Sequence, residues 1–351
     1  MKIAIVHDWM VQLGGAERVL IELHKTFPDA PIYTLFTNQE FTKNHLPEAK
    51  VRTSYLQKIP GITKIYPYLA MLMPIAIESF DLSDFDIVIS SSPFFAKGVV
   101  TRPRTKHICY CYSPSRQLWD NAKNQKGIFK KIGQHFLRIW DRHSADRVDT
   151  FVAISKTAQE RIKKYYGRES QVIYPPFTLQ LAESQLSPVK EPYYLIVSRL
   201  YPNKNIHVAI EAFNKLDYPL FIIGEGPMRA ELEKQAKQNI RFLGFQPDSA
   251  VVTWYKHAKA FIMPQEEDFG LTAVESLASG TPVLALRKGG AMEIVQEGIT
   301  GELFNDPRPE VLAEGVFRLN KNLENYDKAA MLATAEKFSR ERFNKEIKNI
   351  I

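Results

Sequence analysis

The sequence predicts an α/β protein made of two consecutive domains, each a parallel sheet with helices on both faces. Short runs rich in Val, Ile and aromatic residues alternate with helical stretches along the whole chain, which is typical of strands joined by crossover helices. The 351 residues exceed a usual single core, so two domains of about 150 to 180 residues are expected. The pattern also stops at Pro175-Pro176 and restarts after a polar stretch.

The first series of strands is expected at residues 3–7, 32–36, 87–90, 107–111 and 151–154, with a helix at about 15–27. The second series is expected at residues 194–197, 220–223, 241–243, 260–263 and 283–285, with helices from about Asn205, Pro227, Ser249, Leu271 and Ala291. In open α/β sheets, ligands bind at the carboxyl ends of the strands. The segments that follow these strands are therefore where function is expected.

Composition narrows the class of protein. The hydrophobic fraction of 45% and the charged fraction of 24% are those of a soluble globular protein. The only cysteines, Cys109 and Cys111, are too close along a strand to pair readily and too few for a zinc site. No run approaches the roughly 20 apolar residues of a membrane span, and the apolar N-terminus is too short for a signal peptide. We expect a reduced, cytoplasmic protein.

Positive charge is concentrated in the first half. Residues 1–174 hold 25 Lys/Arg against 16 Asp/Glu (+9), and the remainder holds 21 against 23 (−2). The excess lies between residues 97 and 168 and includes Lys123, Lys126, Lys130, Lys131, Arg138, Arg142, Lys163 and Lys164. A basic face favours membrane lipid, a phosphorylated acceptor or nucleic acid as partner, although a solvated surface without a partner is an equal alternative.

Two apolar segments lie within or near this basic region. Residues 65–77 are too short to span a membrane, and a helical stripe is formed by Ile128, Ile132, Phe136, Ile139 and Trp140. Either segment could lie on a bilayer surface. A stripe at this spacing is more often part of a core.

The segment from Glu266 to Glu275 carries the clearest functional signal. Gly270 permits a turn into a helix, and free N–H groups at a helix start bind phosphate. Glu267 precedes the turn and Glu275 falls on the second helical turn, so both carboxylates flank the expected anion, where they can hold sugar hydroxyls. The alternative is a capped helix in an ordinary core.

Other loops after expected strands add binding groups. Gly14-Gly15 lets a ligand approach backbone N–H groups, without the spacing of a dinucleotide fingerprint. Arg199 and Lys204 can neutralise a diphosphate, unless they are ordinary surface charges. Gly224-Glu225 can receive a base or ribose.

Another polar loop follows the cysteine-containing strand. Tyr112, Arg116 and Asp120 are candidates to line the facing wall of the site. In the alternative interpretation, Trp119 anchors the core and Arg116 pairs with Asp120.

Together these residues resemble the retaining glycosyltransferases of GT-B fold, in the large bacterial family that builds surface polysaccharides and glycolipids from nucleotide sugars. The most specific element is the pair Glu267 and Glu275 with Phe269-Gly270 between them. The longer sequence motifs at residues 14–19, 113–120, 266–270 and 288–293 are most similar to those of the mannosyltransferase branch of O-antigen and exopolysaccharide assembly.

The resemblance implies a role for each matched residue. Arg199 and Lys204 would neutralise the diphosphate and Glu275 would bind the ribose, while Glu267 and the backbone of Phe269, Gly270, Leu271 and Thr272 would hold sugar and phosphates. It implies GDP-mannose as donor, a lipid-linked saccharide as acceptor, no divalent metal and front-face attack with retention. The expected domains are 1–175 for the acceptor and 176–336 for the donor, with a helix at 337–351 packing back on the first domain.

The resemblance also implies a peripheral position on the inner face of the cytoplasmic membrane, held by the basic first domain. One departure concerns Tyr112, because many relatives carry a His there that contacts the donor sugar, and a phenol titrates far from neutrality. The alternatives are a nucleotide-sugar epimerase of the same fold and a non-catalytic nucleotide-sugar-binding subunit. Nucleic-acid binding ranks below these, since no recognised module is present.

Overall fold

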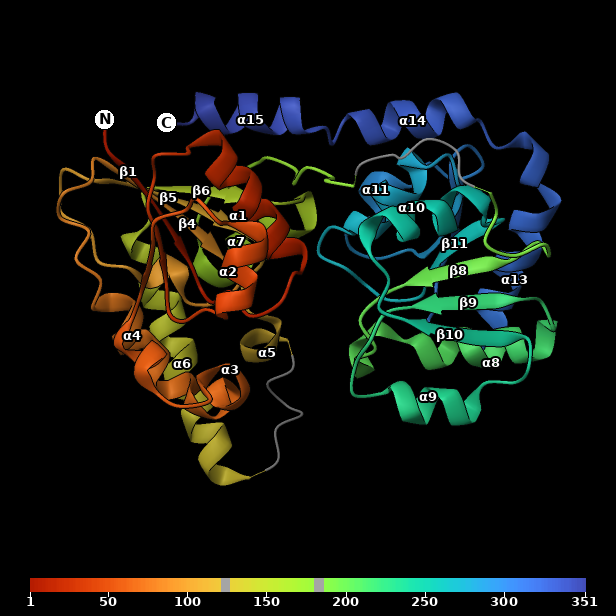
Figure 1. The fold of residues 1–351 in the computed structure, drawn as a ribbon, viewed down its shortest axis with the longest axis horizontal. Helices are drawn as coiled ribbons and strands as arrows, with labels where there is room; N and C mark the ends of the chain where they lie inside the picture. The colour runs from red at the N-terminus through yellow and green to blue at the C-terminus, as the bar shows by residue number, and fades with distance from the viewer. Residues whose placement is uncertain (121–126, 180–185) are drawn as a thin grey trace. The chain divides into compact units, whose positions relative to one another are not determined.

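The computed structural model describes residues 1–120, 127–179 and 186–351, so Lys123 and Lys126 lie outside the described residues. The chain forms two compact units. Unit 1 contains residues 1–176 and 343–351, and unit 2 contains residues 177–342 (Figure 1). No helix in the described ranges is long and apolar enough to cross a membrane.

Unit 1 is built on a seven-stranded parallel sheet in the order β3-β2-β1-β4-β5-β6-β7. Its strands are β1 (Ile3–His7), β2 (Ile32–Thr34), β3 (Val51–Thr53), β4 (Ile87–Ser92), β5 (Lys106–Cys111), β6 (Thr150–Ala153) and β7 (Ser170–Val172). Its helical segments are α1 (Gly15–Thr26), α2 (Gln39–His45), η1 (Tyr55–Lys58), α3 (Ile62–Ile65), η2 (Tyr66–Leu72), α4 (Met73–Glu78), η3 (Ala96–Gly98), α5 (Arg116–Trp119), α6 (Ile128–Ser144), η5 (Ala145–Arg147) and α7 (Lys156–Tyr166).

Unit 2 is built on a six-stranded parallel sheet in the order β10-β9-β8-β11-β12-β13. Its strands are β8 (Tyr194–Val197), β9 (Leu220–Ile223), β10 (Ile240–Gly244), β11 (Ala260–Met263), β12 (Val283–Leu286) and β13 (Gly301–Phe304). Its helical segments are η6 (Pro202–Lys204), α8 (Ile206–Leu216), α9 (Arg229–Gln235), α10 (Asp248–His257), α11 (Leu271–Ala278), α12 (Ala291–Ile294), α13 (Pro309–Lys321), η7 (Leu323–Asn325) and α14 (Lys328–Glu336).

Helices cover both faces of the sheet in unit 2, as expected for parallel strands. Figure 1 shows α8 and α9 on one side of strands β8 to β10, with α10 and α11 on the other. The central strand β11 is completely buried, and its apolar run is the kind of sequence from which a buried strand can be predicted. The predicted fold class, two α/β domains with parallel sheets, is confirmed.

The last helix, α15 (Arg340–Asn349), ends the chain against unit 1. The ring of Phe343 packs edge-on against Tyr110 of β5, with ring centroids 5.7 Å apart. Thr26 Oγ1 at the end of α1 donates to Asn344 Oδ1 at 2.7 Å. These contacts tie residues 343–351 to the first sheet and its first helix.

Each sheet reverses its strand order at one position. In unit 1 the reversal lies between β1 and β4, and in unit 2 it lies between β8 and β11. The loops that leave two such strands run to opposite faces of the sheet, and the carboxyl ends at this reversal are where open α/β sheets bind ligands. The loops after β1, β4, β8 and β11 are therefore the ones to examine.

Candidate functional site

In unit 2, a lysine and a glutamate meet at the reversal point. Lys204 ends the short η6 turn after β8, and Glu267 lies in the loop after β11. Lys204 Nζ donates to Glu267 Oε1 at 2.6 Å. The two side chains are 11% and 27% exposed, so the pair is shielded but still open to a ligand. The strand order thus joins two residues that are 63 positions apart.

The environment of Glu267 keeps its carboxylate ionised. Burial raises the pKa, but the charge and hydrogen bond of Lys204, the Gln265 amide and the charge of Arg199 together hold it below its usual value. Gln265 Nε2 donates to the same oxygen, Oε1, at 3.0 Å. An ionised carboxylate accepts hydrogen bonds and does not donate a proton. Glu267 is therefore suited to holding hydroxyl groups.

The loop that carries Glu267 is shaped by glycines. Gly270 has φ +106° and directly precedes α11 as its N-cap. The first N–H groups of this helix, those of Leu271 and Thr272, have no partner within the helix. The N–H of Gly290 donates to Glu267 O at 2.9 Å. A Cβ at Gly290 would lie 2.0 Å from Phe269 O, so only glycine allows this contact. Sequence reasoning gave Gly290 no structural role.

Glu275 lies on the buried side of α11. It is 7% exposed, and Tyr255 OH of α10 lies 3.4 Å from Glu275 Oε2. The carboxylate is thus held from within unit 2. A contact with ribose stays a prediction.

The loops after β8 and β9 support each other. Gly224 has φ +130°, and a Cβ there would lie 2.0 Å from Ser198 O. The N–H of Leu200 donates to Glu225 O at 2.9 Å. The Glu225 side chain is exposed and pairs with Arg229. Arg199, in the same pair of loops, is exposed, with its guanidinium 5.7 Å from the Tyr201 ring centroid.

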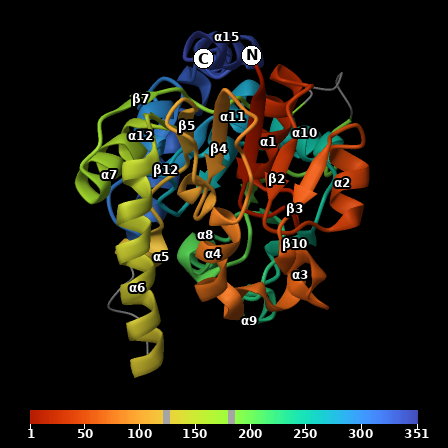
Figure 2. The same ribbon diagram turned by 90° about the vertical axis from the view of Figure 1, so that its left-hand side faces the viewer.

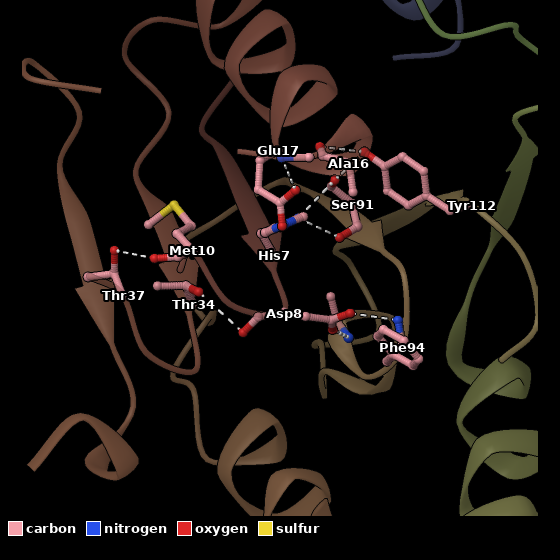
Figure 3. A network of polar contacts seen from close by, with 12 residues as sticks. His7, Asp8, Met10, Ala16, Glu17, Thr34, Thr37, Ser91, Phe94 and Tyr112 are labelled. Carbon is pink, nitrogen blue, oxygen red and sulfur yellow. Dashed lines mark hydrogen bonds and ion pairs between the residues drawn. The ribbon is translucent and has the colours of Figure 1, made fainter. Parts of the chain in front are cut away.

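In unit 1, the loop after β1 leads through Gly14 to Gly15, the first residue of α1. The N–H of Gly14 donates to Glu17 Oε2 at 2.9 Å. Figure 3 shows Glu17 turned back over the helix start beside the imidazole of His7. His7 is completely buried, and its Nε2 lies 3.9 Å from Glu17 Oε1. Neither His7 nor Glu17 was singled out from the sequence.

Tyr112, just after β5, closes this network. Its hydroxyl donates to Ala16 O at 2.9 Å and lies 3.0 Å from Ser91 Oγ (Figure 3). Burial raises the pKa of Tyr112 well above its usual value, more than the Ser91 hydrogen bond lowers it. The phenol stays protonated and fixes the start of α1 against the sheet. A contact between Tyr112 and donor sugar stays a prediction.

Asp8 is a further residue that sequence reasoning missed. Its carboxylate, which is buried, accepts hydrogen bonds from the N–H groups of Phe94, Phe95 and Ala96 at 2.6, 2.7 and 2.5 Å. Burial raises its pKa, while His7 and these three donors limit the rise. Asp8 therefore joins the loop after β1 to the loop after β4, the two loops at the reversal point. Its position as the first residue after a strand was the available signal.

Arg116 is the first residue of the short helix α5, and Asp120 directly follows the helix. Arg116 Nε lies 3.8 Å from Asp120 Oδ2, while Arg161 binds the same oxygen at 2.6 Å. Trp119 Nε1 donates to Asp141 of α6 at 2.7 Å. The ion pair of the alternative interpretation is present, whereas Trp119 is only partly buried and contacts α6 through its indole N–H. A role for Arg116 and Asp120 in lining an acceptor site stays a prediction.

Each unit matches a family model. Residues 179–337 match Glycosyl transferases group 1, and residues 13–181 match Glycosyltransferase Family 4.

Three similar proteins cover most of the chain. The uncharacterized glycosyltransferase MJ1178 of Methanocaldococcus jannaschii is 26% identical over 334 residues, which cover 92% of this chain and 90% of that protein. The alpha-1,3/1,6-mannosyltransferase ALG2 of Kluyveromyces lactis is 22% identical, with 100% and 84% covered. The crystal structure of Anabaena Alr3699/HepE in complex with UDP and glucose has a TM-score of 0.73 at 20% identity, with 100% and 99% covered.

Proposed function

We propose that this chain is a group 1 glycosyltransferase of GT-B fold that moves a hexose from a nucleotide diphosphate sugar to a lipid-linked saccharide. We propose mannose from GDP-mannose as the transferred group and retention as the stereochemical outcome. The assignment of mannose is supported by the amino-acid sequences of the motifs and by the similarity to a mannosyltransferase of Kluyveromyces lactis.

One observation carries the proposal: Lys204 and Glu267 meet at the strand reversal of unit 2. Departure of a nucleoside diphosphate places negative charge on its phosphates, and fixed cations stabilise that charge. Lys204 and Arg199 supply the cations, and the start of α11 supplies backbone N–H donors. In this proposal Lys204 turns from Glu267 to the diphosphate, and Glu267 accepts hydrogen bonds from the sugar hydroxyls.

We assign no covalent nucleophile and no metal. The acceptor hydroxyl attacks the anomeric carbon on the side that the diphosphate leaves, and its proton passes to a phosphate oxygen of the leaving group. Because two side-chain cations already face the leaving charge, we expect transfer to be unchanged by EDTA.

The donor is tested by thermal stability in the presence of GDP, UDP, ADP and their sugars. A ligand that binds only the folded protein at 100 times its Kd stabilises it by about 2.7 kcal/mol. We expect GDP and GDP-mannose to raise Tm most. If UDP-glucose alone stabilised the protein, the donor would be UDP-glucose and not GDP-mannose. UDP ligands must be included because the Anabaena protein of similar fold was crystallised with UDP and glucose.

The reaction is tested by supplying the stabilising donor with and without a lipid-linked saccharide extract. Transfer should require the acceptor, and NMR of the product should show that the sugar keeps its anomeric configuration. An epimerised nucleotide sugar formed without acceptor would contradict the proposal. A lipid-linked acceptor also requires work at a membrane, so we propose peripheral association with the inner face of the cytoplasmic membrane.

A further inference from the structure

Unit 1 exposes a group of large apolar side chains on neighbouring elements. We call this group the α6 face. Its members are between 42% and 89% exposed. They are Tyr68, Met71, Leu72 and Ile75 of η2 and α4, and Ile128, Ile132, Phe136 and Ile139 of α6.

The two halves of the α6 face are contiguous. A Cβ built on Gly133 of α6 would lie 3.4 Å from Met71 Sδ. Trp140 Nε1 donates to Glu78 Oε1 of α4 at 2.7 Å, and Figure 2 shows α6 running beside α4. Trp140, expected in the same stripe, therefore belongs to the packed side of the helix, and the remaining four residues of the stripe are exposed.

Lysines border the α6 face, and the acid at the end of α4, Glu78, is paired with Arg147. Residues 55–77 and 128–140 contain no Asp or Glu. Exposed Lys130, Lys131 and His135 border the apolar stripe on α6, and Lys58 and Lys64 are exposed on the segment before η2. A helix with an apolar stripe bordered by lysines is typical of one that lies in a membrane interface.

The occupant that fits this face is a bilayer with anionic lipids. Protein interfaces are depleted in lysine, whereas each Lys or Arg near an anionic surface contributes about 1 kcal/mol, or about fivefold in affinity. The basic border and the apolar stripe thus fit the two layers of a membrane surface, headgroups and acyl chains.

The packed side of α6 holds α5. Gln134 Nε2 donates to Gln117 O at 2.6 Å, and Asp141 accepts from Trp119 Nε1 at 2.7 Å. Asp141 also pairs with the buried Lys97 of η3. The helix that carries the apolar face on one side therefore positions the α5 segment, with Arg116 and Asp120, on the other.

We infer that the α6 face docks unit 1 onto an anionic lipid bilayer and thereby presents the α5 segment to an acceptor held in that bilayer. The docking itself needs only the α6 face. The role in acceptor presentation rests on the proposed function.

Docking is tested by co-sedimentation of the full chain with vesicles of phosphatidylglycerol and phosphatidylethanolamine, with pure phosphatidylcholine for comparison. The test variant is Phe136→Asp with Lys131→Glu. A matched control is Phe317→Asp with Lys321→Glu on α13, since Phe317 is 56% exposed and Phe136 is 57% exposed. A second variant, Ile128→Ser with Ile132→Ser, removes apolar surface without adding charge.

We expect salt-sensitive binding of the wild type to the anionic vesicles, at least tenfold weaker binding of both α6 variants, and less than a twofold change in the control. Equal binding to phosphatidylcholine, or equal losses in test and control variants, would overturn the proposal. A wild-type dimer seen by light scattering that the α6 variants abolish would show that a second copy of this chain covers the face instead.

Activity separates the two proposals. The α6 variants should keep the nucleotide-induced rise in Tm and the transfer to a detergent-solubilised acceptor, while transfer to acceptor in vesicles should fall at least tenfold. Unchanged transfer in vesicles would contradict acceptor presentation. Vesicle binding without any donor turnover would instead contradict the proposed function and leave docking intact.

Discussion

Replacing Lys204 with Met removes the ammonium group that lies 2.6 Å from Glu267 Oε1. The carboxylate then keeps its Gln265 hydrogen bond but loses its closest charge. Breaking a fully buried pair costs about 3 to 5 kcal/mol, and exposed pairs contribute about 0 to 1 kcal/mol. With side chains 11% and 27% exposed, the Lys204–Glu267 pair lies between these limits, so we expect Lys204→Met to lower the free energy of unfolding of unit 2 by about 2 kcal/mol.

The double variant Lys204→Met with Glu267→Gln removes the unpaired charge. We expect it to recover most of the stability that Lys204→Met loses. The single variant Glu267→Gln completes the double-mutant cycle, for which we expect a coupling energy of at least about 1.5 kcal/mol. Lys204→Met and the double variant should both bind the nucleoside diphosphate at least tenfold more weakly than wild type, because neither has the Lys204 cation.

Unit 2 has a built-in probe for this cycle. Trp254 is the one tryptophan of the four in the sequence that falls in residues 177–342, and it packs against Tyr193 with ring centroids 5.3 Å apart. When the protein is labelled with 5-fluorotryptophan, the ¹⁹F NMR signal of Trp254 during urea unfolding reports the unfolding of unit 2 separately from that of unit 1. A coupling energy below about 0.5 kcal/mol, or normal nucleotide affinity in the double variant, would refute the reasoning.

Three further predictions follow from the site and its supports. Tyr112→Phe removes the hydroxyl bonded to Ala16 O and should destabilise unit 1 by about 1 to 2 kcal/mol in urea unfolding. Tyr112→His should keep or raise the rate of sugar transfer, and a complete loss of transfer would show that position 112 has another role. Burial lowers the pKa of His107 to about 4, so the unfolded chain takes up this proton at a higher pH than the folded chain. The free energy of unfolding should therefore rise by about 2 kcal/mol from pH 5 to 7. His107→Gln should remove this rise, and the same dependence of unfolding free energy on pH in the variant would contradict the assignment. Gly224→Ala would place a Cβ 2.0 Å from Ser198 O at φ +130° and should cost about 3 kcal/mol or more with weaker nucleotide binding; a wild-type Tm would show that the loop relaxes.

Interior strands could be predicted from the sequence because their side chains are buried on both faces and read as apolar runs. The bounds of β1, β8, β9 and β11 coincide with the predicted ones. Three strands were missed, β3, β7 and β13, and each lies at an edge of its sheet. An edge strand has a neighbour on one side only, so short polar segments such as Ser170–Val172 can form one.

The site could be predicted in part. Lys204 and Glu267 were chosen because each follows a strand, but their ion pair depends on β8 and β11 being neighbours, a fact of strand order that no local pattern contains. For the same reason the role of Asp8 was not predicted, since its partners, at residues 94 to 96, follow β4. The stripe on α6 could not be assigned to core or surface until its packed side was known.

A crystal structure with the nucleoside diphosphate that stabilises the protein most is the measurement that tests the donor site most directly. We predict phosphate oxygens within about 2.7 to 3.2 Å of Lys204 Nζ and of the backbone N–H groups at the start of α11, with the Lys204–Glu267 bond lengthened or shared. A diphosphate bound elsewhere, with that bond unchanged, would contradict the account.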